Sequence, residues 1–105
     1  MRIVFLSLTF VAVSATAAFA ADAKAGAAVY DKSCKSCHGA DGTPNPAMAK
    51  MMKVEMVDLK SPAAQALSDD DMKKIITQGK GKMKPIASVT GASVDNVVAY
   101  VRSLK

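Results

Sequence analysis

The sequence has no tryptophan, three phenylalanines and two tyrosines, so aromatic side chains make up only 5% of its 105 residues. A domain of this size has a thin hydrophobic core, and small domains commonly add a disulfide, a metal or a cofactor to reach stability. The shortage of aromatic side chains therefore indicates that some other large, flat group fills the centre of the fold.

Hydrophobic runs long enough to anchor the chain across a membrane are also missing. The longest apolar stretch, residues 3–13, follows the positively charged Met1-Arg2 and precedes Ala18-Phe19-Ala20. A charged start, a short apolar segment and a small-x-small site are typical of a secretory signal peptide. The sequence predicts a leader at residues 1–20, cleaved to release one exported domain at residues 21–105. An uncleaved N-terminal anchor is the alternative.

Negative charge is in deficit: the net charge is +5, and it falls to +4 without residues 1–20, where Arg2 is the only charged residue. The positive charge comes mainly from lysine, without the arginine clusters and interleaved aromatic residues of nucleic-acid-binding proteins. Gly79 and Gly81 have neither the spacing nor the preceding strand of a phosphate-binding loop. The composition argues against nucleic-acid binding, and these glycines argue against nucleotide binding.

Helical periodicity runs through the exported part, and no stretch shows the alternation of a β-strand. Ser68 is a good helix N-cap, followed by three aspartates in the first turn, and Gly79 is a typical helix end. Ser93 is expected to cap the last helix, in which valines recur at helical spacing. We predict an all-α fold with helices at residues 23–35, 48–56, 68–78 and 93–104 and an irregular segment at 58–65.

All the cysteine and histidine of the chain lies in one pentapeptide, Cys34-Lys-Ser-Cys37-His38. A disulfide across two intervening residues forms a small strained ring, and a thioredoxin-like oxidoreductase needs a preceding strand that the sequence does not show. A zinc site lacks a fourth ligand, and the adjacent Cys37 and His38 are poorly placed to bind one ion. These three chemistries are therefore disfavoured.

The remaining chemistry is covalent attachment of c-type haem, for which Cys-x-x-Cys-His is the attachment motif. The thiols of Cys34 and Cys37 would add to the two vinyl groups of the porphyrin, because two intervening residues span the distance between those groups. His38 follows directly, so its imidazole can bind the iron. Since the motif, the leader and the helical pattern agree, the sequence predicts one covalent haem c.

Four other segments carry a family resemblance. Gly26-Ala-Ala-Val-Tyr30 precedes the pentapeptide on the same expected helix, and Leu67 to Ile76 forms the next well-defined helix. Gly79-Lys-Gly-Lys-Met83 follows as a loop, and Val97 to Leu104 ends the last helix. Together with Cys34 to His38, these segments resemble small bacterial monohaem class I cytochromes c over essentially the whole exported chain.

The resemblance implies a cytochrome c fold in which the first and last helices cross at close range, wrapped around one haem. Gly26 would permit this crossing, with the chain's two tyrosines packed nearby. The resemblance also implies that a proline carbonyl in the loop after the motif accepts a hydrogen bond from the second nitrogen of His38. Pro46 fits that position, with Pro44 as the alternative.

With a single histidine, the sixth iron ligand within the chain must be methionine, lysine, water or nothing. Methionine is usually a pliable core filler, and Met72 on a regular amphipathic face fits that role. Met83 differs, because it lies in a loop broken by glycines and flanked by lysines, and the resemblance points to the same residue. Met52 and Met56 are the alternatives. The methionines at positions 48, 51, 52 and 56 are otherwise expected to form one wall of the haem pocket.

A histidine–methionine pair fills both axial positions of the iron and raises its reduction potential relative to two nitrogen ligands. With no open position, electron transfer is favoured over oxygen or peroxide chemistry. We therefore expect a periplasmic, monomeric electron carrier rather than an enzyme. A haem sensor with a labile Met83, a dedicated subunit of a larger redox complex and a thiol oxidoreductase are the alternatives.

Lysines surround the expected distal ligand. In proteins of the resembling family, the corresponding stretches border the exposed haem edge, where positive charge would steer an acidic redox partner. An ordinary solvated lysine face is an equal alternative. Lys82 or Lys84 is also expected to be the nearest replacement for Met83 at high pH. The lysines concerned are Lys35, Lys80, Lys82 and Lys84.

Overall fold

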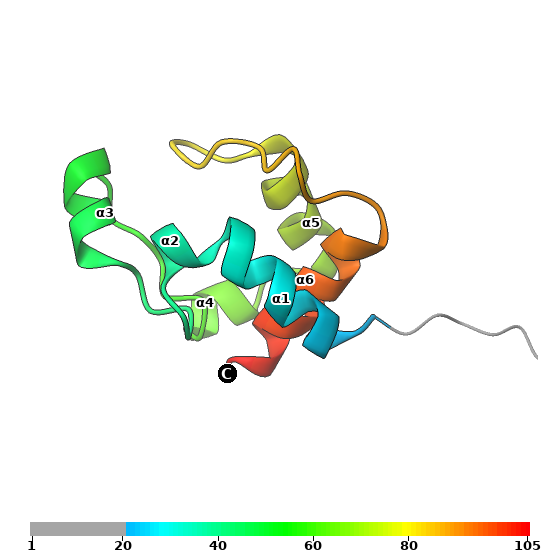
Figure 1. The fold of residues 1–105 in the computed structure, drawn as a ribbon. Helices are drawn as coiled ribbons and strands as arrows, with labels where there is room; N and C mark the ends of the chain where they lie inside the picture. Colours follow the sequence, from blue (N-terminus) through cyan, green and yellow to red (C-terminus); the bar gives the residue numbers. More distant parts are fainter. Residues whose placement is uncertain (1–20) are drawn as a thin grey trace, which may run out of the picture.

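The structure, a computed structural model, describes residues 21–105, and the expected leader at residues 1–20 lies outside them. This part of the chain folds into helices and contains no strand, which confirms the all-α prediction (Figure 1). Its one β-type pairing is an isolated bridge between Lys80 and Met83. The helices are α1 (Ala23–Ser33), α2 (Lys35–His38), α3 (Pro46–Met52), α4 (Pro62–Gln65), α5 (Asp69–Gln78) and α6 (Ala92–Ser103).

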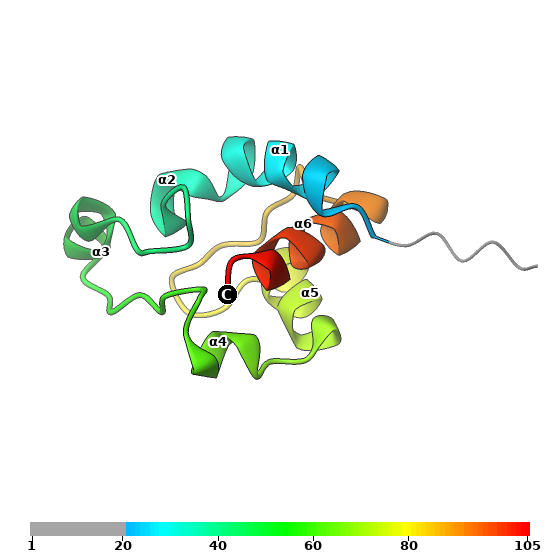
Figure 2. The ribbon, with the colours of Figure 1, turned by 90° about the horizontal axis from the view of Figure 1, so that it is seen from below.

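Helices α1 and α6 come from opposite ends of the described chain and cross at close range (Figure 1 and Figure 2). Gly26 makes this possible, because a β-carbon at that position would lie 1.9 Å from the carbonyl oxygen of Asn96 on α6. Tyr30 is completely buried beside the crossing, and its ring centroid lies 4.9 Å from that of Tyr100. The expected crossing, its glycine and the tyrosine pair are therefore confirmed.

The hydrophobic core lies between α1, α5 and α6. Arg102 of α6 fixes the start of α5 against this core, because it donates hydrogen bonds to the carbonyl oxygens of Gln65 and Leu67 and to the carboxylate of Asp69. The valine stripe of α6 faces inward, as its spacing predicted. The buried core residues are Tyr30, Cys34, Met72, Ile76, Val89, Val94, Val97, Val98 and Val101.

The ends of α5 agree with the sequence prediction. Ser68 caps the helix, since its hydroxyl accepts a hydrogen bond from the backbone N–H of Asp71 at 3.1 Å. Gly79 ends it with a φ of 77°, a conformation that a residue with a β-carbon adopts only at a cost. The acidic first turn therefore has a structural role at the positive end of the helix dipole.

The first and third helices differ from the prediction. The helix expected at residues 23–35 is interrupted at Cys34, so the pentapeptide continues as the separate short helix α2. The methionine-rich helix begins at Pro46 rather than at residue 48, because Asn45 caps it and proline suits a first helical position. It ends at Met52 because Lys53 adopts a left-handed conformation with a φ of 54°.

Two further differences concern helix starts. Residues 62–65, expected to be irregular, form α4, because the Ser61 hydroxyl accepts a hydrogen bond from Ala64 N–H and Pro62 again occupies the first helical position. The last helix begins at Ala92, so Ser93 lies inside its first turn and is not its cap. Gly91, with a φ of 56°, takes the capping position without a side-chain hydrogen bond.

Candidate functional site

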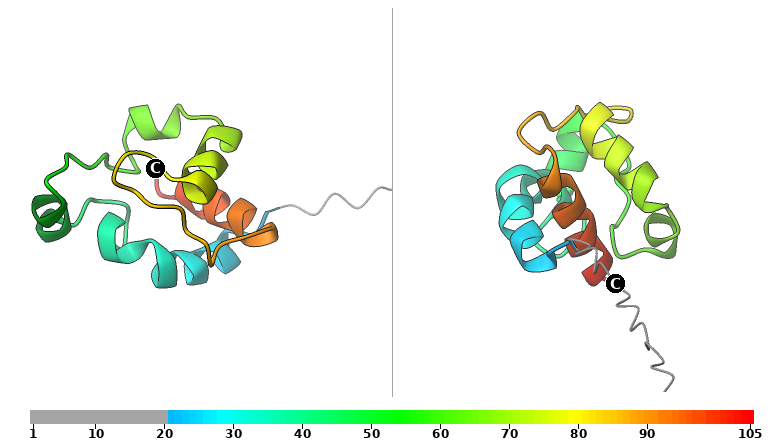
Figure 3. Two further views of the ribbon diagram at one scale, coloured as in Figure 1. Left: turned by 90° about the horizontal axis from the view of Figure 1, so that it is seen from above. Right: turned by 90° about the vertical axis from the view of Figure 1, so that its right-hand side faces the viewer.

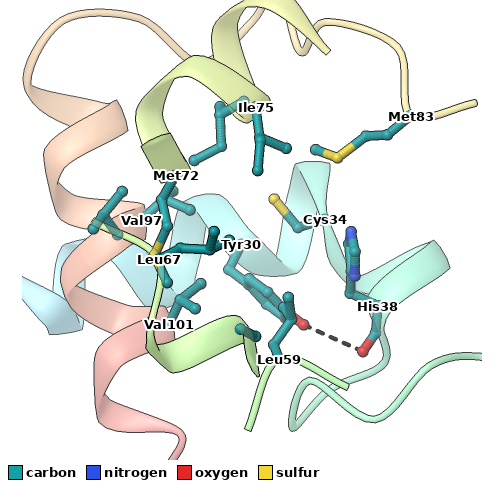
Figure 4. Close-up of a pocket in the computed structure, with 13 residues that line it drawn as sticks. Tyr30, Cys34, His38, Leu59, Leu67, Met72, Ile75, Met83, Val97 and Val101 are labelled. Carbon is teal, nitrogen blue, oxygen red and sulfur yellow. Dashed lines mark hydrogen bonds between the residues drawn. The ribbon is translucent and has the colours of Figure 1, made fainter. Parts of the chain in front are cut away.

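His38 and Met83 both line two adjoining cavities, one of about 100 Å³ and one of about 620 Å³. We call these two volumes together the central cavity. In the close-up, the side chains of His38, Cys34 and Met83 face the same space beside the core (Figure 4). Most of the lining side chains are aliphatic or thioether, which suits a large apolar group, and the charged ones border the larger cavity. Both cavities are lined by His38, Leu59, Ala64, Leu67, Ile75 and Met83.

The two cysteines border different parts of the central cavity. Cys34 is buried and lines its inner part, whereas Cys37 is half-buried and lines its outer part. Neither forms a disulfide. Burial, assisted by the neighbouring Cys37, raises the pKa of the Cys34 thiol to about 11. A buried, protonated thiol is a poor nucleophile, so Cys34 is poorly suited to begin thiol–disulfide exchange.

The imidazole of His38 faces the cavity with one nitrogen unsatisfied. Burial lowers its pKa, which favours the neutral form that binds metals. Nδ1 is buried and has no hydrogen-bond partner among residues 21–105, so the bond expected to the Pro46 carbonyl is not formed in this structure. An imidazole and a thioether in one apolar cavity are the axial donor set of c-type cytochromes, so these residues fit a haem.

Two tyrosines hold the backbone at His38 and at the two residues that follow it. The Tyr30 hydroxyl donates to the carbonyl oxygen of Gly39 at 2.7 Å and lies 3.4 Å from that of His38 (Figure 4). Tyr100 donates from α6 to the Ala40 carbonyl oxygen at 3.2 Å. These hydrogen bonds therefore link the crossing of α1 and α6 to the backbone that positions His38.

Asn45 is a positioning residue that the sequence analysis missed. Its backbone N–H donates to the Cys37 carbonyl oxygen at 2.9 Å, and its side-chain amide donates to the Ser36 carbonyl oxygen at 3.1 Å. Its side-chain oxygen caps α3 by accepting from Ala47 and Met48 N–H groups. The Asn-Pro pair at residues 45–46 was the available signal, because it is typical of a helix start.

The loop that carries Met83 is a tight turn closed by two backbone hydrogen bonds. Lys80 N–H donates to the Met83 carbonyl oxygen at 2.9 Å, and Met83 N–H donates back at 3.0 Å. Gly79 is required there, because a β-carbon would lie 2.5 Å from the Met83 carbonyl oxygen. Ile86 N–H then fastens the loop to the Ile76 carbonyl oxygen of α5. These bonds leave the thioether free to enter the cavity.

The remaining methionines separate into three groups. Met48, Met52 and Met56 line the larger cavity, as the expected pocket wall requires. Met51 lies on the same helix with 67% of its surface exposed, so the prediction was wrong for that residue. Met72 is buried in the core, as predicted. The central cavity is thus lined by five thioethers, and Met83 is the one that borders both of its parts.

The lysines differ in their access to this space. Lys80 and Lys82 line the larger cavity, whereas Lys84 and Lys35 are exposed and do not border it. Of the two lysines expected to replace Met83 at high pH, the geometry therefore favours Lys82 over Lys84. Lys80, which the sequence analysis had not considered for this role, is equally well placed along the cavity wall.

Asp41 anchors the loop after the pentapeptide. It accepts hydrogen bonds from Thr43 N–H at 3.0 Å and from the Lys60 ammonium at 3.1 Å, and these lower its pKa to about 2. Because the folded pKa lies below the ordinary 3.8, this stabilisation is present above about pH 4 and lost as the pH falls towards 2.

We therefore expect the free energy of unfolding to fall less steeply with decreasing pH in Asp41→Asn than in the wild-type protein. Urea unfolding of the holoprotein, followed by helix circular dichroism between pH 2 and 6, should show a smaller loss for this variant than for the wild-type protein. Asp31→Asn, at an exposed position of α1, is the matched control. A wild-type and an Asp41→Asn profile of equal steepness below pH 4 would contradict the assignment.

Comparison with known proteins places the chain in a family. Residues 21–101 match the family model described as cytochrome c oxidase, cbb3-type, subunit III. One similar solved structure is the c-type cytochrome KustC0563, with a TM-score of 0.65, 28% sequence identity, and coverage of 76% of this chain and 96% of that one. A search of curated proteins found no match. None of the helices in the described part of the chain is long and apolar enough to cross a membrane.

Proposed function

The chain belongs to the family of c-type cytochromes described as cytochrome c oxidase, cbb3-type, subunit III. On this basis we propose that it is a periplasmic carrier of single electrons. Family membership establishes a small class I cytochrome c fold with covalently bound haem c. The proposal adds that Cys34 and Cys37 form the thioethers and that His38 and Met83 are the axial ligands. The observation that carries it is that all four side chains line one apolar cavity.

The bound haem supplies an iron that gains and loses one electron between the ferrous and ferric states. The protein holds its donors in place, because Tyr30 and Asn45 restrain the backbone around Cys37 and His38 from two sides. The aliphatic side chains that line the smaller cavity would keep water from that face of the haem, which stabilises the reduced, less charged state. With one donor on a short helix and the other on a tight loop, neither has to move far during electron transfer.

The lysines around the Met83 loop support an acidic partner, because clustered positive charge raises the rate of encounter with a negative surface. Lys80, Lys82 and Lys84 are all exposed along this loop. We propose that an acidic redox protein docks there. The second-order rate constant for electron transfer between the two proteins should then fall as ionic strength rises.

The function is tested on protein produced with haem-attachment machinery. We expect the mass of the mature chain to increase by one haem, the haem to resist acidic organic extraction, and the Cys34→Ala/Cys37→Ala double variant to carry none covalently. The ferric protein should show the weak long-wavelength band of an iron–thioether bond, and the ferrous protein should bind carbon monoxide slowly and incompletely. Rapid, complete carbon monoxide binding would instead favour a haem sensor, and unmodified thiols would exclude a c-type cytochrome.

A further inference from the structure

One side chain joins two segments that border the larger cavity. Lys82 of the Met83 loop donates a hydrogen bond from Nζ to the carbonyl oxygen of Met52, 2.7 Å away and 30 residues distant in sequence. Both residues line the larger cavity. The contact therefore connects the loop carrying the proposed distal ligand with the methionine-rich helix α3.

The accepting carbonyl belongs to the last residue of α3. The N–H groups of Lys53 and Val54 turn back to the carbonyl oxygens of Ala49 and Lys50, which leaves the Met52 carbonyl without a partner inside the helix. The C-terminal end of a helix carries partial negative charge, which attracts an ammonium group. Lys82 thus satisfies a helix end that the local sequence leaves open.

Helix α3 has few other attachments. It stands apart from the crossing of α1 and α6 (Figure 1, Figure 2 and the left view of Figure 3). Within residues 21–105, the hydrogen bonds that tie its two ends to other segments are those of Asn45 at its start and Lys82 at its end. Loss of the Lys82 bond would free one end of this cavity wall.

We propose that Lys82 is a positioning residue for Met83, because it fastens the Met83 loop to the end of α3. Met83 follows Lys82 directly, and its backbone is already paired with Lys80, so a restraint on the Lys82 side chain restrains the whole turn. The bond also occupies the Lys82 amine, which would otherwise be available as a replacement ligand. This inference rests on the proposed ligation by Met83.

The test measures how easily an external ligand displaces Met83 from the ferric holoprotein. Imidazole is added at pH 7, and loss of the iron–thioether band gives its apparent dissociation constant. A Met83 loop that is no longer fastened to α3 gives way to imidazole more readily. Lys82→Ala should therefore lower the apparent dissociation constant of imidazole about three- to tenfold. Lys82→Arg, which keeps a charged donor, should stay closer to the wild-type value. Lys84→Ala removes the same charge from the same loop at a position outside the cavity wall and should change the constant less than twofold.

A second readout follows α3 itself. Hydrogen exchange of its backbone amides should be faster in Lys82→Ala than in Lys84→Ala, because only the first substitution releases the end of the helix. If the wild-type protein shows no iron–thioether band, the ligation by Met83 is wrong and this inference fails with it. If the band is present but Lys82→Ala matches Lys84→Ala, Lys82 has no positioning role and the ligation stands.

Discussion

Replacing Met83 with alanine is expected to leave the covalent haem in place and to abolish the long-wavelength ferric band. The thioether is the donor that raises the potential of a histidine-ligated haem, and axial ligands set haem potentials over a range of about 0.8 V. The midpoint potential of Met83→Ala should therefore fall by on the order of 0.1 V or more. Visible spectra and a potentiometric titration of the two proteins measure both effects.

The other cavity methionines provide matched controls for this experiment. Met52→Ala and Met56→Ala remove a thioether from the same cavity wall, and Met51→Ala removes an exposed one. All three variants should keep the ferric band and lie close to the wild-type potential. Retention of the band in Met83→Ala, together with its loss in Met52→Ala or Met56→Ala, would transfer the ligand role to that methionine.

The second large effect is expected at the helix crossing. In Gly26→Ala the new methyl group would lie 1.9 Å from a backbone oxygen of α6, and backbone cannot move aside as a flexible side chain can. Alanine favours a helix over glycine by about 1 kcal/mol, but overpacking typically costs about 1–3 kcal/mol and more at backbone contacts. We expect a net loss of about 2–3 kcal/mol in the free energy of unfolding.

Urea denaturation of the ferric holoprotein at 25 °C measures this loss. Ala28→Val is the control, because it adds a larger side chain at an exposed position of the same helix and should cost less than about 1 kcal/mol. Since Tyr30 joins α1 to the backbone of Gly39, the Gly26 variant should also lose its ferric band at lower urea concentration. Equal stability of the two variants would mean that the crossing tolerates a wider separation.

The sequence predicted the parts of the site that depend on neighbouring residues or on a known pattern. The pentapeptide is contiguous, so its three side chains must lie together, and the resemblance placed Gly26 at the crossing. The end of α3 was beyond prediction, because it depends on Lys53 in a left-handed conformation that lysine seldom adopts. The bond from Lys82 to Met52 depends on that ending and spans 30 residues, so no local pattern indicated it.

Two errors came from reading a residue in isolation. Residues 58–65 were expected to be irregular, although Ser61 followed by Pro62 is a helix start. Ser93 was interpreted as a cap because of its side chain, whereas the backbone freedom of Gly91 moved the capping position two residues earlier. The first error missed the short helix α4 and the second displaced the start of α6, and neither changed the fold class.

The crossing of α1 and α6 also has a consequence for the order of events during biogenesis. Asp22 and Asn96 are bonded across 74 residues, so the interface that buries Tyr30 forms only after nearly the whole chain has emerged. Closing so long a loop is entropically costly and therefore a late step. Until then Cys34, which is buried in the finished fold, remains reachable in a chain without its partner helix. Delayed closure would thus give the attachment machinery an interval in which to act on both thiols.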